Sequence, residues 1–277
     1  MIGGAQGLVV RTYTVVDEAL LDRAPCLKVV ARAGVGLDNI DIDACRARGI
    51  EVVHTPQANT RAVVEFVGSI MLGTLRPIEG VDQAMDLDAW KELRRASLAS
   101  RQLSDLTLGI YGLGRIGSQV ARLGAALDMN VIYNDLAEIP VAKRFGAEPV
   151  NADTLLAESD VLTIHVDGRT ENRGLIGAEA LSQMKRDVVL INTSRGFVIE
   201  PDALGVFLKS HPEARAFIDV HGPAPFGTDY PLLGRNNCVL TAHVAAGTVS
   251  AKTAMSWVVE DVWRVLNGEK ASNRAPI

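Results

Sequence analysis

Short apolar runs alternate with amphipathic segments along most of the chain. Apolar runs bounded by glycine or polar residues are typical of strands buried in a parallel sheet, and apolar positions spaced i, i+4, i+7 are typical of helices that cover one. Strand patterns lie at residues 7–12, 27–31 and 50–53, with helical patterns between them at residues 16–23 and 41–48. This alternation predicts a small parallel α/β unit.

The same alternation resumes further along the chain. Strands are expected at residues 107–111, 130–134, 161–165, 188–192, 216–219 and 239–241. Helices are expected between them at residues 153–157, 178–184 and 201–210. Parallel strands joined by helices in this way predict a doubly wound sheet, whose ligands bind at the carboxyl ends of the strands.

Three further segments have helical patterns. They cover residues 61–75, 82–95 and 249–266, and the first of them is largely apolar. Helices like the first two either join two domains or form a dimer face, or they are buried inside one domain. The pattern alone leaves both interpretations open.

The strand at residues 107–111 leads into the stretch that organises the rest of the chain. Gly112, Gly114 and Gly117 form a G-x-G-x-x-G pattern that opens a helix, and Asp135 follows the next strand. The glycines permit a tight turn, close approach to a pyrophosphate and close packing of helix on strand, while the acid binds ribose hydroxyls and repels a 2′-phosphate. The pattern predicts a dinucleotide site that prefers NAD to NADP.

Composition and charge narrow the class of protein. The chain has 277 residues, 48% hydrophobic and 22% charged, with a net charge of -5 that argues against a nucleic-acid partner. The most apolar window, residues 62–75, is interrupted by Glu65 and is too short to span a bilayer. Cys26, Cys45 and Cys238 have no metal-ligand spacing. We expect a cytoplasmic protein with no metal and no membrane partner.

Chemistry is expected at the carboxyl ends of four strands. These ends are His165 with Val166, and residues 191–196, 218–220 and 241–248. Arg195 has a planar guanidinium that can hold a carboxylate through two hydrogen bonds and polarise an adjacent carbonyl. His243 has an imidazole suited to giving a proton to that carbonyl oxygen as hydride arrives, or to removing one in reverse.

Five motifs in order resemble one family. RAGVGLDNID, GLGRIG with Asp135, RGLIG, INTSRG and TAH-x-A look like the D-isomer-specific 2-hydroxyacid dehydrogenases, and their wording is closest to the 3-phosphoglycerate dehydrogenase branch. The resemblance implies a Rossmann NAD domain, residues 76–247, inserted in a smaller flavodoxin-like substrate domain, residues 1–75 and 248–277. It also implies a small 2-hydroxy or 2-oxo acid as substrate and a homodimer formed through residues 61–95.

Site residues follow from the resemblance, position by position. Arg195 matches the substrate-binding arginine and His243 the acid/base histidine, while Val35 and Gly36 match the loop whose N–H groups hold the substrate carboxylate. Arg32 matches a residue able to reach a distal phosphate. The implied cofactor contacts, beyond the glycines and Asp135, are Arg115, Ile116, His165, Val166, Thr193, Ser194, Asp219 and Ala245.

The sequence departs from the family at its third catalytic residue, a glutamate that pairs with the histidine. Ala224, followed by Pro225, occupies that position. Loss of the orienting acid predicts a chemical step slowed by about 10²–10⁴-fold. Asp229 is an alternative acid if its loop folds back, and a solvated loop residue otherwise. Three hypotheses stay open: a dehydrogenase, an NAD-binding homologue with little turnover, and an enzyme specialised to an unusual acid.

The beginning of the chain is a second departure. The family has a strand and helix before the segment that starts here near Gly7, and that strand is central in its sheet. Either the reading frame begins upstream or the substrate domain is reduced, lacking its usual first strand. His54 and His211 lie near turns and are expected to be solvated, whereas His221 lies close enough to Asp219 to be a possible substrate contact.

Overall fold

The computed structural model describes residues 2–78, 80–98 and 101–276, so the remaining residues of the expected domain ranges lie outside the described part. The chain divides into two compact units. The small unit consists of Met1–Val63, Asp167–Thr170 and Ala246–Ile277, and the large unit of Val64–Val166 and Glu171–Ala245. The first division falls inside the helix expected at residues 61–75, whereas the domain boundary was expected at its end.

A three-stranded parallel sheet with the order β1-β2-β3 forms the small unit. Its strands are β1 (Gly7–Val10), β2 (Val29–Arg32) and β3 (Glu51–His54), and its helices are α1 (Glu18–Asp22), α2 (Ile42–Ala47), α9 (Val249–Ser256) and α10 (Val259–Leu266). Alternate residues of β2 face opposite sides of the sheet. Val29 belongs to the same core cluster as Val258, and Val30 to the cluster of Leu21 and Cys45. The sheet is therefore buried on both faces, with β1 at one edge.

Both short helices between these strands begin at an aspartate. The side chain of Asp17 accepts the N–H of Leu20 at the start of α1, and that of Asp41 accepts the N–H of Ala44 at the start of α2. Such caps satisfy N–H groups that lack a partner within the helix. Gly49, with φ of 68°, then turns the chain toward β3.

The helix expected at residues 249–266 is wrong as a single element, because the structure divides it into α9 and α10. The N–H of Trp257 bonds to the carbonyl of Ala254, and the N–H of Val258 to that of Met255. These bonds reach back three residues, as in a 3-10 turn, where an α-helix reaches back four. The tighter turn ends α9 before α10 begins.

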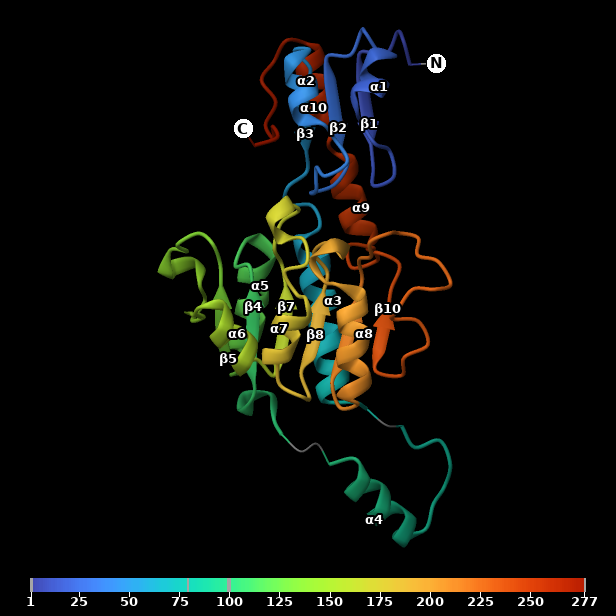
Figure 1. The fold of residues 1–277 in the computed structure, drawn as a ribbon, viewed down its shortest axis with the longest axis vertical. Coiled ribbons are helices and arrows are strands. Elements are labelled where there is room, and N and C mark those ends of the chain that lie inside the picture. The colour runs from blue at the N-terminus through green and yellow to red at the C-terminus, as the bar shows by residue number, and fades with distance from the viewer. Residues whose placement is uncertain (1, 79, 99–100, 277) are drawn as a thin grey trace. The chain divides into compact units, whose positions relative to one another are not determined.

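The large unit contains a seven-stranded parallel sheet with the order β10-β9-β8-β7-β4-β5-β6 (Figure 1). Its strands are β4 (Thr107–Tyr111), β5 (Asn130–Asn134), β6 (Glu148–Pro149), β7 (Val161–Ile164), β8 (Val189–Asn192), β9 (Arg215–Ile218) and β10 (Cys238–Leu240). The expected doubly wound sheet is confirmed, with one strand more than predicted. The sequence signal for β6 is weak because this strand has two residues and one is a proline, which is tolerated at a sheet edge.

Helices lie on both faces of this sheet (Figure 1). They are α3 (Thr60–Leu75), which begins in the small unit, α5 (Arg115–Ala126), α6 (Ala152–Glu158), α7 (Ala178–Gln183) and α8 (Pro201–Ser210). The same unit also contains α4 (Leu87–Ala96). Among the described residues, short 3-10 helices cover Leu103–Asp105, Val141–Lys143, Thr170–Asn172 and Gly196–Val198. All residues of β7 and β8 are buried, as expected for central strands covered on both sides.

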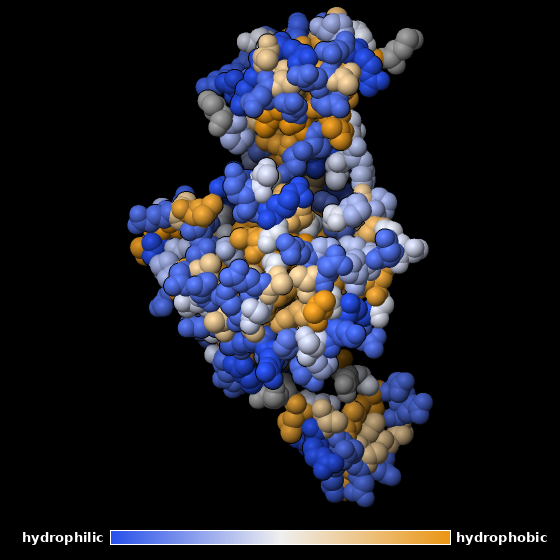
Figure 2. All heavy atoms as spheres, viewed as in Figure 1, coloured by the Kyte–Doolittle hydropathy of each residue, from blue (hydrophilic) through white to orange (hydrophobic). Residues whose placement is uncertain are grey.

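The helices α3 and α4, whose role the sequence pattern left open, differ in burial. Val67 and Met71 of α3 are fully buried, so α3 belongs to a core. None of the described residues of α4 is buried. Figure 2 shows apolar side chains exposed on the segment that carries α4. Leu87 is 66% exposed and Trp90 is 46% exposed, which is more than a stable helix face usually leaves to water.

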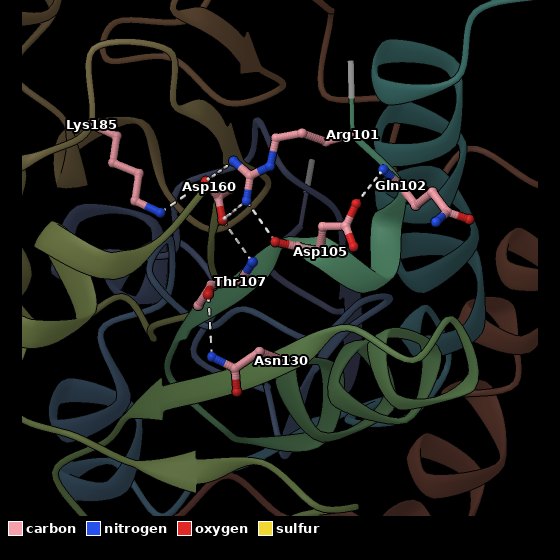
Figure 3. Close-up of polar contacts among 7 residues, drawn as sticks. All are labelled: Arg101, Gln102, Asp105, Thr107, Asn130, Asp160 and Lys185. Atoms are coloured by element: carbon pink, nitrogen blue, oxygen red, sulfur yellow. Dashed lines mark hydrogen bonds and ion pairs between the residues drawn. The ribbon is translucent and has the colours of Figure 1, made fainter. Parts of the chain in front are cut away.

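A charged cluster ties the amino ends of β4 and β7 together (Figure 3). Asp160, which precedes β7, accepts 2.8 Å hydrogen bonds from Arg101 Nη1 and Lys185 Nζ and a 2.7 Å bond from the N–H of Thr107. Burial alone would raise the pKa of Asp160, but the bonds from Lys185, Thr107 and Arg101 outweigh it and hold this pKa below its usual value. The cluster therefore stabilises the sheet at the amino ends of two central strands, away from their carboxyl ends.

Within the described residues, no helix has the length and apolar character needed to cross a bilayer. The same residues contain no group of three or more His, Cys, Asp or Glu side chains placed to hold a metal ion.

Candidate active site

The glycine turn after β4 has the geometry that a bound pyrophosphate requires. Gly112 has φ of 93°, and a Cβ there would lie 2.9 Å from the main-chain carbonyl of His165. A Cβ on Gly117 would lie 2.1 Å from the Gly112 oxygen. Around a Cβ on Gly114, by contrast, no atom of the described residues lies within 4 Å. Packing requires the first and third glycines, and the second leaves open space beside the backbone.

Helix α5 begins directly at this open space. Gly114 is its N-cap and makes no side-chain hydrogen bond to the helix. The first-turn N–H groups of Arg115 and Ile116 have no partner within the helix, so they are available to a phosphate at its positive end.

Asp135, at the end of β5, connects the glycine turn to a cavity. Its Oδ2 accepts the N–H of Leu113 at 2.7 Å, and its Oδ1 accepts the N–H of Ala137 at 2.9 Å. Each carboxylate oxygen has a further lone pair for a ribose hydroxyl. The adjoining cavity has a volume of about 330 Å³ and is lined by Tyr133, Asp135, Leu136, Ala137, Glu138, Arg144, Pro149 and Val150.

A buried hydroxyl at the end of β8 also indicates a ligand. Thr193 Oγ1 is buried and has no hydrogen-bond partner among the described residues. An unpaired buried polar group costs about 1–3 kcal/mol, which a ligand can recover by bonding to it. The unpaired hydroxyl of Thr193 and the open space at Gly114 both fit the expected NAD.

His165 and Val166 extend β7 beside the glycine turn. The N–H of His165 donates to the carbonyl of Tyr111 at 2.7 Å, and its Nε2 lies 2.9 Å from Thr163 Oγ1. Burial lowers the pKa of His165 to about 3, so the ring is neutral at neutral pH. A ring that stays neutral favours a cofactor contact over acid catalysis at this position.

The turn that carries Arg195 is held by one buried amide. Asn192 Oδ1 accepts from the N–H of Ser194 at 3.0 Å and from its hydroxyl at 2.7 Å, while Asn192 Nδ2 donates to the Arg195 carbonyl at 3.0 Å. Arg195 Nη1 donates to the Ser194 carbonyl at 2.8 Å. The Ser194 hydroxyl, expected at the cofactor, is directed to Asn192. At Gly196 a Cβ would lie 2.1 Å from the main-chain carbon of His221, so only glycine fits after Arg195.

The turn that carries His243 is held by one buried carboxylate. Asp219 Oδ1 accepts from Thr241 Oγ1 at 2.6 Å and from the N–H of Val244 at 2.7 Å, and its Oδ2 accepts the N–H of Ala245 at 2.9 Å. His243 itself has φ of 55° and is exposed. A non-glycine residue in the left-handed region is unfavourable, and it is found at functional sites where the surroundings impose it.

The segment that replaces the family's glutamate is organised by aromatic rings. His221 Nε2 lies 2.8 Å from the Thr241 carbonyl, its Nδ1 lies 3.3 Å from the Tyr230 hydroxyl, and Phe226 stacks on Tyr230 with ring centroids 4.5 Å apart. Because the Thr241 carbonyl only accepts, His221 holds its hydrogen on Nε2. Both ring nitrogens are therefore bonded within the protein.

Ala224 is exposed in this same segment. Asp229, the alternative acid, is also exposed. Its carboxylate lies beside the backbone of its own loop, because its Oδ1 is 2.7 Å from the position that a Cβ on Gly227 would take.

The small unit contributes the remaining expected residues. Arg32 ends β2, and its Nη1 donates to the carbonyl of Ala33 at 2.7 Å. Val35 and Gly36 follow in the turn after β2 and are half-buried. The expectation that His54 is solvated is wrong: it is 8% exposed, because it ends a strand of the sheet and its ring bonds to the Val35 carbonyl.

The structure brings the turns of Arg195 and His243 together through a continuous set of hydrogen bonds. Asn192 Nδ2 bonds the Arg195 carbonyl, the N–H of Asp219 donates to the Asn192 carbonyl at 3.0 Å, and the N–H of His243 donates to the Asp219 carbonyl at 2.9 Å. The role of Asn192 was not predicted from the sequence. Its signal was an amide at the end of an apolar strand, where an unpaired polar group would be costly.

The comparisons with known proteins agree with the resemblance. Residues 69–245 match the family model described as "D-isomer specific 2-hydroxyacid dehydrogenase, NAD binding domain". The chain is 37% identical to a D-3-phosphoglycerate dehydrogenase of Archaeoglobus fulgidus over 270 residues, which cover 97% of this chain and 51% of that protein. It is 36% identical to a glyoxylate reductase of Aeropyrum pernix, over 89% of this chain and 75% of that protein.

Solved structures give the same result. A D-lactate dehydrogenase from Aquifex aeolicus, in complex with NAD and lactic acid, has a TM-score of 0.82 and 30% identity over 97% of this chain and 85% of that chain. The chain spans about half the length of the phosphoglycerate dehydrogenases that it matches. The expected family and cofactor are confirmed. The chain belongs to the D-isomer specific 2-hydroxyacid dehydrogenase family and contains that family's NAD-binding domain.

Proposed function

We propose that the protein is an NAD-dependent oxidoreductase that interconverts a D-2-hydroxy acid and its 2-oxo acid. One observation carries this proposal: hydrogen bonds from the Arg195 carbonyl through Asn192 and Asp219 to the N–H of His243 join the turns that carry a guanidinium and an imidazole. A cation and a proton donor are the two groups that reduction of a 2-oxo acid needs from the protein.

The roles of the residues follow from their chemistry. Bound NADH supplies the hydride to the carbonyl carbon, and NAD⁺ accepts it in the reverse direction. Arg195 holds the carboxylate and carbonyl oxygen of the substrate, and the N–H groups of Val35 and Gly36 bind its carboxylate. His243 gives a proton to the carbonyl oxygen, which becomes the hydroxyl, or removes that proton when the acid is oxidised.

The substrate is proposed to resemble 3-phosphoglycerate. The relatives named as D-3-phosphoglycerate dehydrogenases support this class, and Arg32 in the small unit offers a cation for a distal phosphate. The relative named as a glyoxylate reductase makes a small unphosphorylated acid the main competitor. Rates of NADH oxidation with 3-phosphohydroxypyruvate, glyoxylate and pyruvate test the choice. Faster turnover of glyoxylate would contradict a role for Arg32 in phosphate binding.

An NAD-binding homologue with little turnover is the second candidate, and Ala224 favours it. This position holds an exposed alanine, so it supplies no carboxylate to fix the tautomer of the catalytic imidazole or raise its pKa. Titration of NADH fluorescence on the protein, run beside the turnover assay, separates the two candidates. Tight NADH binding with no oxidation by any of the three oxo acids would reject the dehydrogenase.

We also propose a homodimer formed through residues 61–95, because α4 exposes Leu87 and Trp90.

The three cysteines are free, and burial raises the pKa of the Cys45 and Cys238 thiols to about 11. Such thiols suit a reducing compartment, so a cytoplasmic location is proposed, which fractionation of cells that express the tagged protein would test.

A further inference from the structure

Most carbonyl groups of the turn after β2, residues 32–36, bond inside the protein. The Arg32 carbonyl accepts the N–H of Gly34 at 2.8 Å, and the Ala33 carbonyl accepts from Arg32 Nη1 at 2.7 Å. Thr55 donates twice to the Gly34 carbonyl, from its N–H at 3.0 Å and from its hydroxyl at 3.2 Å. A turn whose oxygens are satisfied in this way presents N–H groups to a ligand.

Two N–H groups of this turn are left without an acceptor. Among the residues that the structure describes, no hydrogen bond is made by the N–H of Val35 or Gly36, and both residues are half-buried. Backbone N–H groups in such places are nearly always paired, and successive unpaired ones form a concave site for an anion. This is the place where the proposed function puts the substrate carboxylate.

The next carbonyl of the turn is held by His54. This residue ends β3, and 8% of its surface is exposed. Its Nδ1 lies 3.0 Å from the carbonyl oxygen of Val35. A carbonyl oxygen can only accept a hydrogen bond, so Nδ1 carries the hydrogen and donates it.

We propose that His54 is a positioning residue that orients the Gly36 N–H toward the substrate carboxylate, an inference that rests on the proposed function. The peptide group between Val35 and Gly36 is trans, so its C=O and N–H point in opposite directions within one plane. A donor that fixes the oxygen therefore fixes the direction of the N–H. His54 acts through the backbone and does not itself touch the substrate.

Three substitutions separate this role from simple packing. The amide nitrogen of His54→Asn takes nearly the place of Nδ1, that of His54→Gln takes the place of Nε2, and His54→Leu keeps apolar volume without a donor. We expect His54→Gln and His54→Leu to raise the KM for the 2-oxo acid about ten-fold, with kcat and the Kd for NADH changed less than about two-fold. His54→Asn is expected to stay within about three-fold of the wild-type KM.

A binding assay tests the same point without turnover. Oxamate, a 2-oxo acid analogue that is not reduced, is titrated into the ¹⁵N-labelled, NADH-loaded protein while the amide resonances of Val35 and Gly36 are followed. We expect both resonances to shift in the wild type and in His54→Asn, with a Kd about ten-fold higher in the other two variants.

Equal KM and Kd values in all three variants would overturn the proposal, and so would the absence of an oxamate shift at both amides of the wild type. A wild type that binds oxamate at these amides but reduces no 2-oxo acid would contradict the proposed function alone. The role of His54 in carboxylate binding would then stand.

Discussion

The main-chain oxygen of Asp219 accepts the N–H of His243 at 2.9 Å, while the Asp219 carboxylate accepts three more hydrogen bonds from Thr241, Val244 and Ala245. One buried residue therefore holds almost the whole turn that presents the imidazole. The φ of 55° at His243 is maintained by these bonds and not by the residue's own preference.

Replacing this carboxylate should displace the imidazole and lower turnover more than it lowers the affinity for NADH. In Asp219→Asn the amide nitrogen would face an N–H group that now donates to the acid, so the turn would have to move. Because a displacement of about 1 Å at a reacting group can cost about 10²-fold in rate, we expect kcat to fall by about that factor. Stopped-flow NADH oxidation and NADH titration measure the two effects, and a fall in NADH affinity equal to the fall in kcat would contradict this role.

Restoring the family's acid should raise turnover. We expect Ala224→Glu to increase kcat by about 10²-fold or more, because a carboxylate paired with His243 fixes its tautomer and stabilises the imidazolium. Ala224→Gln is the matched control, since it has a similar size without charge. Steady-state NADH oxidation over a pH series would show the alkaline limb of the profile move to higher pH only in the glutamate variant, because His243 must be protonated to act as the acid. Equal rates in both variants would show that charge at this position is irrelevant.

The preference for NAD should depend on the charge of Asp135. Asp135→Asn keeps an oxygen for the N–H of Leu113, which the acid now accepts at 2.7 Å, but loses the repulsion of a 2′-phosphate. We expect the ratio of the Kd for NADPH to that for NADH to fall about ten-fold, as expected for the loss of about 1.4 kcal/mol of repulsion. Fluorescence titration with both cofactors measures this ratio. Asp135→Ala, which also loses the bond to Leu113, should weaken NADH binding further.

Asp160 should make the stability of the large unit depend on pH. Its folded-state pKa lies below the usual value, so folding favours the ionised form. That contribution is complete above the unfolded-state pKa, near 4, and is lost as pH falls toward the folded-state value. We expect Asp160→Asn to lower the free energy of unfolding by about 3 kcal/mol at pH 7 and by less at low pH. Urea unfolding at a series of pH values tests this, and a difference that stays constant with pH would contradict it.

The exposed face of α4 should support the dimer. Trp90→Asp places a charge where a partner would bury an indole, so we expect a shift toward monomer of about ten-fold or more in the dissociation constant. Lys91→Ala, on a neighbouring exposed position, is the matched control and should leave the dimer intact. Sedimentation equilibrium measures both. A wild-type protein that is monomeric in this experiment would contradict the proposed dimer.

The sequence was informative wherever periodicity or glycine chemistry determines structure. The expected strand positions are confirmed within one or two residues, because apolar runs in a buried parallel sheet have few alternatives. It was not informative about partners that come together only in the fold. His54 holds a turn that lies 19 residues before it in the sequence, and its bond to the Val35 carbonyl depends on the pairing of β2 with β3. Asn192 bonds to Ser194 and Arg195 within its own turn, so its amide was a local signal.

The break between α9 and α10 escaped prediction for a related reason. The apolar stripe continues through Trp257 and Val258, so periodicity gives no sign of it. Asp261 accepts the N–H groups of Ser272 and Asn273, a tertiary contact that sequence pattern does not reveal.

All strands of the large sheet run in one direction, which separates its tasks by distance. The charged anchor of Asp160 lies at the amino ends and the reacting groups at the carboxyl ends, about 13 Å apart along a strand of four residues. Substitutions that far apart usually contribute additively. Substitutions at the amino ends of the strands can therefore change the thermal stability of the large unit without changing its substrate preference. Substitutions at the carboxyl ends can change substrate preference without changing stability.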